Sequence, residues 1–243
     1  MNPSPAPYNS AHVRARIVKI LFIVGACAAG MSLVAEALSL AFPAPADNQE
    51  VGENVMGAVI TLFIGLLGIF EFFIYLATVI FFLMWLYRAS NNVQALNPWS
   101  RPEYSAGLAV GSFFIPFANL VLPYRAVKDI WQKSWPADEI SMAAPSTPVS
   151  FHFWWLFWIL SCIAGNISMR LTFSERVTDS SATIVSMIAG AASIMAAIFA
   201  YLVVDAIDKR QEETSGIVKS QNFSGPPPPP SFPPHSDVVA QMP

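Results

Sequence analysis

Residues 55–87 read VMGAVITLFIGLLGIFEFFIYLATVIFFLMWLY, and the only charged side chain in these 33 residues is that of Glu71. A membrane-spanning helix needs about 20 predominantly apolar residues. As a helix this run would extend over about 50 Å, so it must tilt or project beyond the hydrocarbon layer. The stretch therefore predicts a long transmembrane helix.

Three more runs, residues 17–42, 151–170 and 182–207, are also long and apolar enough to span a membrane. The chain is 54% hydrophobic and only 12% charged, whereas soluble domains carry about 25% charged residues. The net charge of −3 argues against the basic patch that a nucleic-acid partner requires. We predict an all-α integral membrane helical bundle over residues 17–207, in contact with the lipid bilayer and not with nucleic acid.

The first run has a competing interpretation as a cleaved signal peptide, because Ala44-Pro45-Ala46 follows it and basic residues precede it. Signal peptides usually have an apolar core of about 7–15 residues. The run over residues 17–42 is longer than that, so the sequence favours a retained transmembrane helix.

The apolar stretch 107–124 is interrupted by Pro116 and Pro123, and the basic residues indicate how it meets the membrane. If it crosses fully, the Lys and Arg residues divide seven to six between the two sides. If it enters and leaves on one side, only Arg170 and Arg176 fall on the side opposite the N-terminus. Cytoplasmic segments carry the excess of Lys and Arg. We therefore predict four transmembrane helices, a re-entrant or interfacial segment and a cytoplasmic N-terminus, with five transmembrane helices as the alternative.

Both ends of the chain are polar and rich in proline. Residues 1–16 predict a disordered N-terminal tail, and residues 208–243 predict a disordered C-terminal tail that contains Pro226–Pro230. Such proline runs are typical ligands of domains with aromatic grooves. The C-terminal tail thus predicts either a cytoplasmic protein partner or a passive solvated segment.

Glu71 is the first candidate for chemistry, because a carboxylate at membrane depth is costly and marks a functional site by default. It could relay protons or bind a cation. The alternative is a protonated side chain that is hydrogen-bonded inside the bundle. Glu36 lies near the outer end of the first run, where we expect it to reach water.

A second set of candidates surrounds the proline-interrupted stretch. Arg88 and Asn92 are four residues apart, share a helix face, and could form one wall of a site with Asn119 and Tyr124. The two prolines free backbone carbonyls, and interrupted segments of this kind form sites in transporters. In the alternative interpretation Arg88 anchors the helix at the lipid headgroups, and Asn119 only binds the freed carbonyls.

Other polar residues favour structural roles. Arg170 is expected to anchor the outer end of the run over residues 151–170, and Asp205 is expected to pair with Lys209. Small residues recur every fourth position from 192 to 200, which predicts close helix packing within the chain or in a homo-oligomer. No metal-ligand spacing and no catalytic or nucleotide-binding signature occurs, so we expect no metal, no cofactor and no enzyme.

Residues 82–131 and 151–170 carry a set of motifs that resembles a known family. The matching residues are Tyr87-Arg88, Asn91 or Asn92, Ser105-Ala106-Gly107-Leu108, Phe114-Ile115-Pro116, Asn119-Leu120, Pro123-Tyr124, Ile130-Trp131, Trp154-Trp155 and Arg170. The chain resembles, over about residues 60–207, the bacterial membrane-protein family called domain of unknown function 4328; Ala106, Leu108 and Arg125 depart from its pattern. The resemblance implies a multi-pass protein of a bacterial inner membrane, marks Trp131 and Trp155 as further candidates, and supplies no activity.

Two functional hypotheses follow from these patterns. The polar tails and the absent catalytic signature favour a non-enzymatic scaffold, sensor or regulator that acts through interactions. The alternative is a small transporter or channel component that uses Glu71 and the interrupted segment around Asn119.

Overall fold

The structure is a computed structural model that describes residues 7–43, 55–97, 102–136, 146–172 and 179–223. Every regular element in these ranges is helical. The four long helices are α1 (His12–Ala41), α2 (Val55–Leu96), α6 (Val149–Thr172) and α7 (Asp179–Phe223). Each is long and apolar enough to cross a membrane, with mean hydropathies from 1.2 to 2.4 over their most apolar segments. The predicted all-α bundle with four transmembrane helices is thus confirmed.

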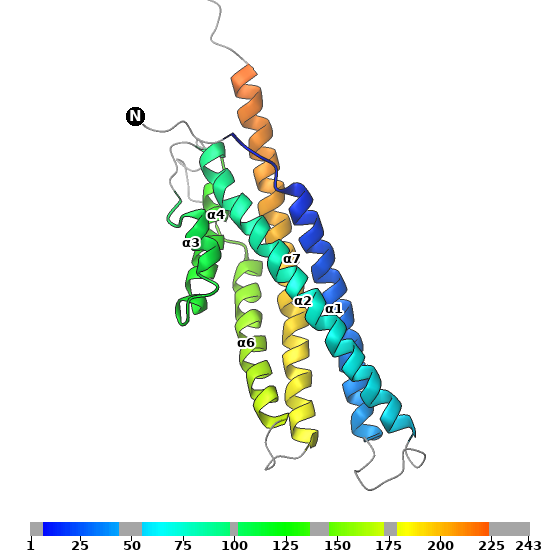
Figure 1. Cartoon of the computed structure of the whole chain (residues 1–243). Coiled ribbons are helices and arrows are strands. Elements are labelled where there is room, and N and C mark those ends of the chain that lie inside the picture. The colour runs from blue at the N-terminus through cyan, green and yellow to red at the C-terminus, as the bar shows by residue number, and fades with distance from the viewer. Residues whose placement is uncertain (1–6, 44–54, 98–101, 137–145, 173–178, 224–243) are drawn as a thin grey trace, which may run out of the picture.

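The four long helices run side by side, and α1 begins at the same end of the bundle at which α7 ends (Figure 1). We call this the inner end and the opposite one the outer end. Helix α2 crosses the bundle diagonally (Figure 1), which is the tilt that its length requires. At 42 residues it would extend over about 63 Å, far more than the hydrocarbon layer of about 30 Å.

Between α2 and α6 the chain forms a helical hairpin. It consists of α3 (Ala106–Gly111), the 3₁₀ turn η2 (Ala118–Leu120) and α4 (Leu122–Lys133). The two ends of this hairpin meet, because the backbone N–H of Glu103 donates to Oδ2 of Asp129 at 2.8 Å. The segment therefore enters and leaves at the inner end, beside α6 (Figure 1), and the alternative of five transmembrane helices is wrong.

The two prolines explain why this stretch turns back. Pro116 lies in the turn between α3 and η2, and it is followed by Phe117, which has a φ of 63°. Pro123 lies in the first turn of α4, where its missing N–H has no helical partner to lose. An apolar stretch with a break and a new helix start at these points cannot continue as one straight span.

Two helix limits correct the sequence analysis. Helix α1 begins at His12 instead of residue 17, and α7 continues to Phe223, so residues 208–223 are not part of a disordered tail. This extension is helical because it packs against the hairpin. The side chains of Gln211 and Thr214 are buried there and donate to Ser134 at 3.0 and 2.8 Å.

The proline run of the tail lies outside the described residues. So does Ala44-Pro45-Ala46, the cleavage site in the competing signal-peptide interpretation. Arg176, one of the two basic residues predicted at the outer end, also lies outside them. Predictions that rest on these residues stay predictions.

The buried core lies in the inner half of the bundle. Its largest fully buried apolar side chains come from α1, α2, α4, α6 and α7, namely Val18, Trp85, Leu86, Val93, Val127, Ile130, Phe151, Val203, Val204 and Ile207. Phe82 joins them to an aromatic group, with ring centroids 5.5 Å from Trp85 and 5.8 Å from Phe113. This core holds the hairpin against the long helices.

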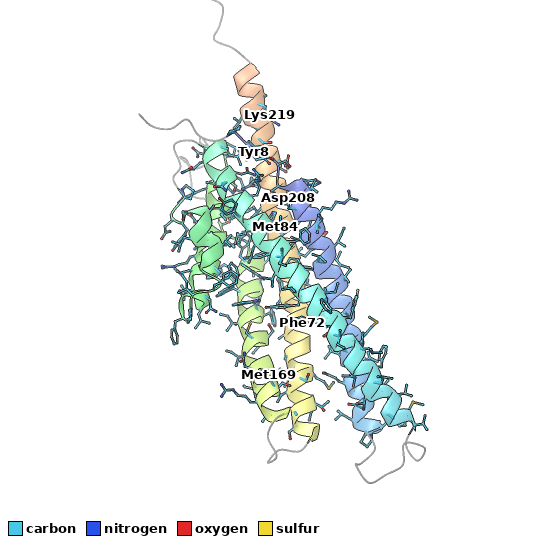
Figure 2. All side chains as sticks on the ribbon, viewed as in Figure 1. Tyr8, Phe72, Met84, Met169, Asp208 and Lys219 are labelled. Atoms are coloured by element: carbon cyan, nitrogen blue, oxygen red, sulfur yellow. The ribbon has the colours of Figure 1, made fainter. Side chains whose placement is uncertain are left out.

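The outer half exposes large apolar side chains. On α2, Leu66, Ile69, Phe72 and Phe73 are each 58–61% exposed. Soluble proteins rarely expose apolar surface of this extent, whereas lipid covers it at no cost. Figure 2 shows the apolar Phe72 and Met169 in this half, while Tyr8, Asp208 and Lys219 lie toward the inner end. The surface therefore agrees with a membrane-embedded outer half.

Candidate functional site

A cavity of about 620 Å³ lies among the four long helices. Its wall is built by α1, α2, α6 and α7, and the hairpin adds Phe113 and Phe114. Most of the lining is apolar, and the polar lining includes the carboxylates of Glu36 and Glu71. Both carboxylates belong to helices that are long and apolar enough to span a membrane, so this cavity is the candidate site.

Serine hydroxyls bind the two carboxylates. Ser32 on α1 donates to Oε1 of Glu71 on α2 at 2.7 Å. Ser186 on α7 donates to Oε1 of Glu36 on α1, also at 2.7 Å. These two hydrogen bonds join α1 to α2 and α1 to α7 across the cavity.

The spacing along α1 makes this arrangement possible. Ser32 and Glu36 are four residues apart, so they lie on one face of the helix and both point toward the cavity. The sequence analysis expected Glu36 to reach water at the outer end and did not anticipate its contact with α7; its side chain is partly buried and accepts a hydrogen bond from Ser186. The spacing of Ser32 and Glu36 was the signal that could have identified the pair.

The charge of the two carboxylates is not balanced by the cavity wall. None of the residues that line the cavity in the described part of the chain is Lys, Arg or His. Two ionised carboxylates in a site of low dielectric constant are costly without a counter-charge. A proton or a cation bound at Glu36 and Glu71 would remove this cost. Among the described residues, no group of three or more His, Cys, Asp or Glu side chains is placed to hold a metal ion.

The inner end of the cavity is aromatic. It is lined by Phe22 of α1, Phe82 of α2, Phe113 of the hairpin, and Trp154 and Trp158 of α6. The centroid of the Phe82 ring is 6.3 Å from that of Phe22 and 6.2 Å from that of Trp154. The cavity thus has an acidic part and an aromatic part, and the hairpin contributes to the aromatic one.

Trp155 fixes the hairpin beside the cavity. Its indole Nε1 donates to the carbonyl of Leu120 at 3.0 Å, at the point where η2 ends. The sequence analysis gave the role of binding freed carbonyls to Asn119. The backbone N–H of Asn119 donates to the carbonyl of Ile115 at 2.9 Å, but its partly buried side chain makes no hydrogen bond to the described residues.

Two members of the predicted wall of Arg88, Asn92, Asn119 and Tyr124 have neighbours that the sequence analysis did not anticipate. The amide of Asn92 is buried and donates to Oε1 of Gln211 at 3.3 Å. Tyr124 packs instead against His152 and Trp155, with ring centroids 5.8 and 6.4 Å away. The sequence did not identify Gln211, since a single glutamine in a charged segment carries no pattern.

The remaining candidates occupy structural positions. Trp131 is buried, and its indole donates to the carbonyl of Ser146 at 3.1 Å. Pro116 is exposed at the tip of the hairpin, whereas Pro123 is buried at the start of α4. Arg170 is exposed in the last turn of α6, at the outer end, as the anchor interpretation expects.

Comparison with known proteins supplies the family. The family model described as "Domain of unknown function (DUF4328)" matches residues 52–209. The chain belongs to this family. No match was found among curated proteins or among solved structures.

The DUF4328 match divides the two carboxylates. It covers α2, the hairpin, α6 and most of α7, so it includes Glu71 and Ser186. Helix α1 precedes it, so Ser32 and Glu36 lie outside the matched residues. The resemblance seen in the motifs around Pro116 is thereby confirmed, and the family description adds no activity.

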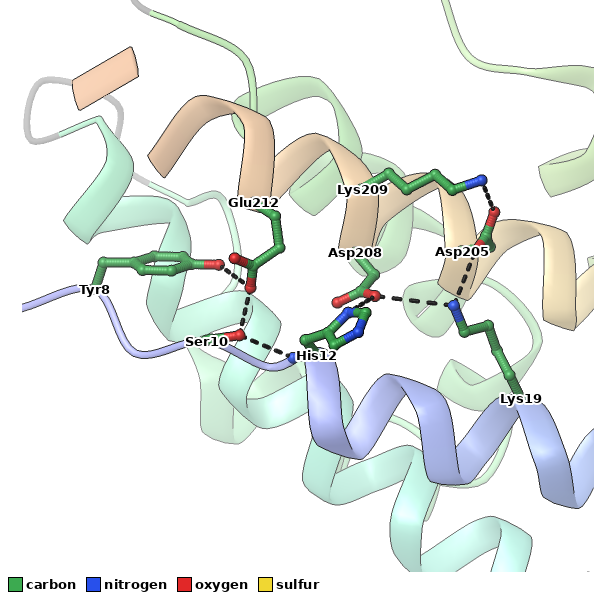
Figure 3. A network of polar contacts seen from close by, with 8 residues as sticks. All are labelled: Tyr8, Ser10, His12, Lys19, Asp205, Asp208, Lys209 and Glu212. Atoms are coloured by element: carbon green, nitrogen blue, oxygen red, sulfur yellow. Dashed lines mark hydrogen bonds and ion pairs between the residues drawn. The ribbon is translucent and has the colours of Figure 1, made fainter. Parts of the chain in front are cut away.

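A second polar group of this DUF4328 protein lies at the inner end, where the chain before α1 meets α7 (Figure 3). We call it the inner-end cluster; its members are Tyr8, Ser10, His12, Lys19, Asp205, Asp208, Lys209 and Glu212. Tyr8 and Ser10 both donate to Oε1 of Glu212, the former at 2.9 Å. His12 lies 2.9 Å from Oδ2 of Asp208.

Lysines complete the inner-end cluster. Nζ of Lys19 is 2.8 Å from Asp205 and 3.9 Å from Asp208, and Lys209 is 2.7 Å from Asp205. The predicted pair of Asp205 and Lys209 is confirmed, and Lys19 is the partner that spacing along one helix could not identify. Burial and the hydrogen bond to Glu212 raise the pKa of Tyr8, so its hydroxyl remains a donor through neutral and mildly alkaline pH.

Proposed function

We propose that this DUF4328 protein is a non-enzymatic membrane protein that binds a cation inside the bundle and serves as a small transporter or channel component. The observation that carries the proposal is the pair Glu36 and Glu71, which line one cavity without a basic side chain among the described lining residues. Intramembrane carboxylates with this surrounding mark pathways for ions and protons.

The cavity favours this function over a scaffold or sensor that acts through the tails. A scaffold needs an interaction surface, and the proline run that suggested one lies outside the described residues. It does not need two carboxylates at membrane depth, each bonded to a serine of another helix. The hydroxyl and carboxylate groups are oxygen ligands, which suit a cation or a proton.

The proposal includes an orientation in a bacterial inner membrane, with the inner end in the cytoplasm. The described basic residues support it, because ten of the eleven Lys and Arg lie in α1, the inner part of α2, the hairpin or the end of α7: Arg14, Arg16, Lys19, Arg88, Arg125, Lys128, Lys133, Lys209, Arg210 and Lys219. Such an excess is typical of the cytoplasmic side. Phosphatase and fluorescent-protein fusions after Pro243 test this orientation; phosphatase activity outside the cell would contradict it.

The cation site is tested by chemical labelling of the full chain in lipid nanodiscs. Dicyclohexylcarbodiimide adds to protonated carboxyl groups in apolar surroundings, and the adduct is measured as a mass increase of the intact protein. We expect labelling of the wild type, protection by an added cation (sodium, potassium or tetraphenylphosphonium), and loss of labelling in the double variant Glu36→Gln, Glu71→Gln. Glu213→Gln is the matched control, because that carboxylate is exposed and pairs with Arg210.

The proposal fails if the double variant is labelled as strongly as the wild type, or if none of the three cations reduces the labelling. Size-exclusion chromatography of each variant, with the elution volume of the wild type as reference, shows that a lost label does not reflect a lost fold.

A further inference from the structure

We infer that the ligand of this cavity is an amphipathic organic cation, whose charge lies between Glu36 and Glu71 and whose apolar body packs against the aromatic part of the cavity. The inference rests on the proposed function and deepens it, since it names the chemical class of the cation. Three features of the cavity carry it: its volume, its length and the separation of its acidic and aromatic parts.

The volume is too large for a bare ion. Sites for small organic molecules enclose about 300–1,000 Å³, and this cavity of about 620 Å³ falls within that range. A monatomic cation held by two carboxylates and two hydroxyls would fill only a small fraction of it. The remaining volume needs an apolar occupant, because most of the wall is apolar.

The cavity is elongated along the helices. Its aromatic and acidic parts are separated along the helices, at Phe22 and Glu36 on α1 and at Phe82 and Glu71 on α2. Fourteen helical positions on α1 correspond to about 21 Å along the axis, and eleven on α2 to about 16 Å. A ligand that reaches both parts must therefore be an extended molecule with one charged end and one apolar end.

The aromatic part suits the body of such a cation. Phe113 stands edge-on to Phe82 and to Trp158, with centroids 5.8 and 6.4 Å apart and interplanar angles of 78° and 81°. Differently oriented rings present both faces and edges to the cavity, which favours packing of an aromatic or branched group, and ring faces also attract cationic groups.

Charge selects the cation against a membrane lipid. A phospholipid could fill the apolar part, but its phosphate would lie beside two carboxylates with no basic side chain among the described lining residues. An organic cation instead supplies the missing counter-charge. The wall thus favours a positively charged amphiphile.

Equilibrium dialysis of a radiolabelled extended cation, trimethylammonium carrying a 6-phenylhexyl chain, against the full chain in nanodiscs tests this inference, with empty nanodiscs subtracted. We expect saturable binding that Glu36→Gln or Glu71→Gln weakens by at least about tenfold. Phe113→Ala and Trp158→Ala should each weaken it by about fivefold, because each removes an aromatic wall. Phe73→Ala and Glu213→Gln are the matched controls and should bind like the wild type, since Phe73 is exposed on the outer surface of α2.

Two competitors separate the contributions of charge and apolar body. Tetramethylammonium has the charged end alone and hexylbenzene the apolar end alone, so neither should displace the probe at concentrations equal to it. Displacement by tetramethylammonium as efficient as by unlabelled probe would overturn the inference. So would equal binding by the wild type and the Phe113→Ala and Trp158→Ala variants.

The two proposals fail in different ways. If sodium or potassium protects the carboxylates from carbodiimide but the phenylhexyl cation does not bind, the inference is wrong and the proposed function stands. If no cation protects and none binds, both are wrong. Trp158→Phe keeps an aromatic ring and should retain most of the binding, which distinguishes the loss of a ring from the loss of the fold.

Discussion

At the inner end, the carboxylates of Asp205 and Asp208 face Lys19 and His12, whereas the carboxylates of Glu36 and Glu71 in the cavity face serine hydroxyls. Both regions use acidic side chains to join helices. In the first, a basic partner within the chain completes each interaction. In the cavity, no basic side chain is among the described lining residues, so a proton or a ligand would supply the counter-charge.

The two regions also differ in packing density: the inner end is densely packed, and the surroundings of the carboxylate pair are not. Around the inner-end cluster Val18, Val204 and Ile207 are completely buried, and the hairpin closes the core. Around the carboxylate pair the helices enclose a cavity. Dense packing and internal ion pairs stabilise a fixed structure, whereas a cavity with uncompensated charge sacrifices stability for binding. The inner half therefore holds the bundle together, and in the proposed function the carboxylate pair of the cavity binds the cation.

Removing a large side chain from the aromatic core should have the largest effect on stability. We expect Phe82→Ala to lower the free energy of unfolding by about 3 kcal/mol, because its ring contacts Phe22, Trp85, Phe113 and Trp154. Phe73→Ala should change it by less than about 0.5 kcal/mol. Thermal unfolding in detergent measures both; equal melting temperatures for the two variants would contradict an inner core.

Breaking the inner-end cluster should have an intermediate effect. Lys19→Met leaves Asp205 with Lys209 as its one remaining lysine partner and leaves the buried Asp208 with His12 alone. We expect a loss of about 1–2 kcal/mol, less than for a fully buried pair because Lys19 is 15% exposed. Lys219→Met should have almost no effect. Equal melting temperatures for Lys19→Met and Lys219→Met would contradict a stabilising role of Lys19. The double variant Lys19→Met, Asp205→Asn should lose less free energy of unfolding than the sum of the two single losses.

Neutralising the cavity should have the smallest effect on stability, and of the opposite sign. Glu36→Gln with Glu71→Gln removes two uncompensated charges and keeps groups that can accept from Ser32 and Ser186. We expect the free energy of unfolding to stay equal or rise by up to about 1 kcal/mol, while cation binding is lost. A melting temperature lowered as far as by Lys19→Met would show that the pair is structural.

Much of the fold could be predicted because its signals are local. The run around Glu71 predicts a span by its length alone, and the basic residues with Pro116 and Pro123 predict a segment that returns to its side of entry. The extension of α7 could not be predicted in this way. Residues 208–223 are polar, and they are helical because Gln211 and Thr214 pack on the hairpin.

The candidate site was predicted in part. Glu71 was identified because a charge in an apolar run is conspicuous, whereas Glu36 was assigned to water because of its position near a helix end. The spacing of Arg88 and Asn92 places them on one face of α2, but spacing within one helix does not identify the helix that packs against that face. Asn92 meets Gln211 of α7 and not the interrupted segment.

The sequence by itself determined the membrane class, the four apolar spans and the family of this protein, and it favoured the returning hairpin over a fifth span. Lipid responds to the length and apolar character of a segment, which are properties of neighbouring residues. Only the tertiary structure decided that Glu36 and Glu71 line one cavity and that Trp155 binds the carbonyl of Leu120. Lipid-facing and core-facing sides of these helices are equally apolar, so their tilt and rotation are set by contacts between helices that no periodicity in the sequence records.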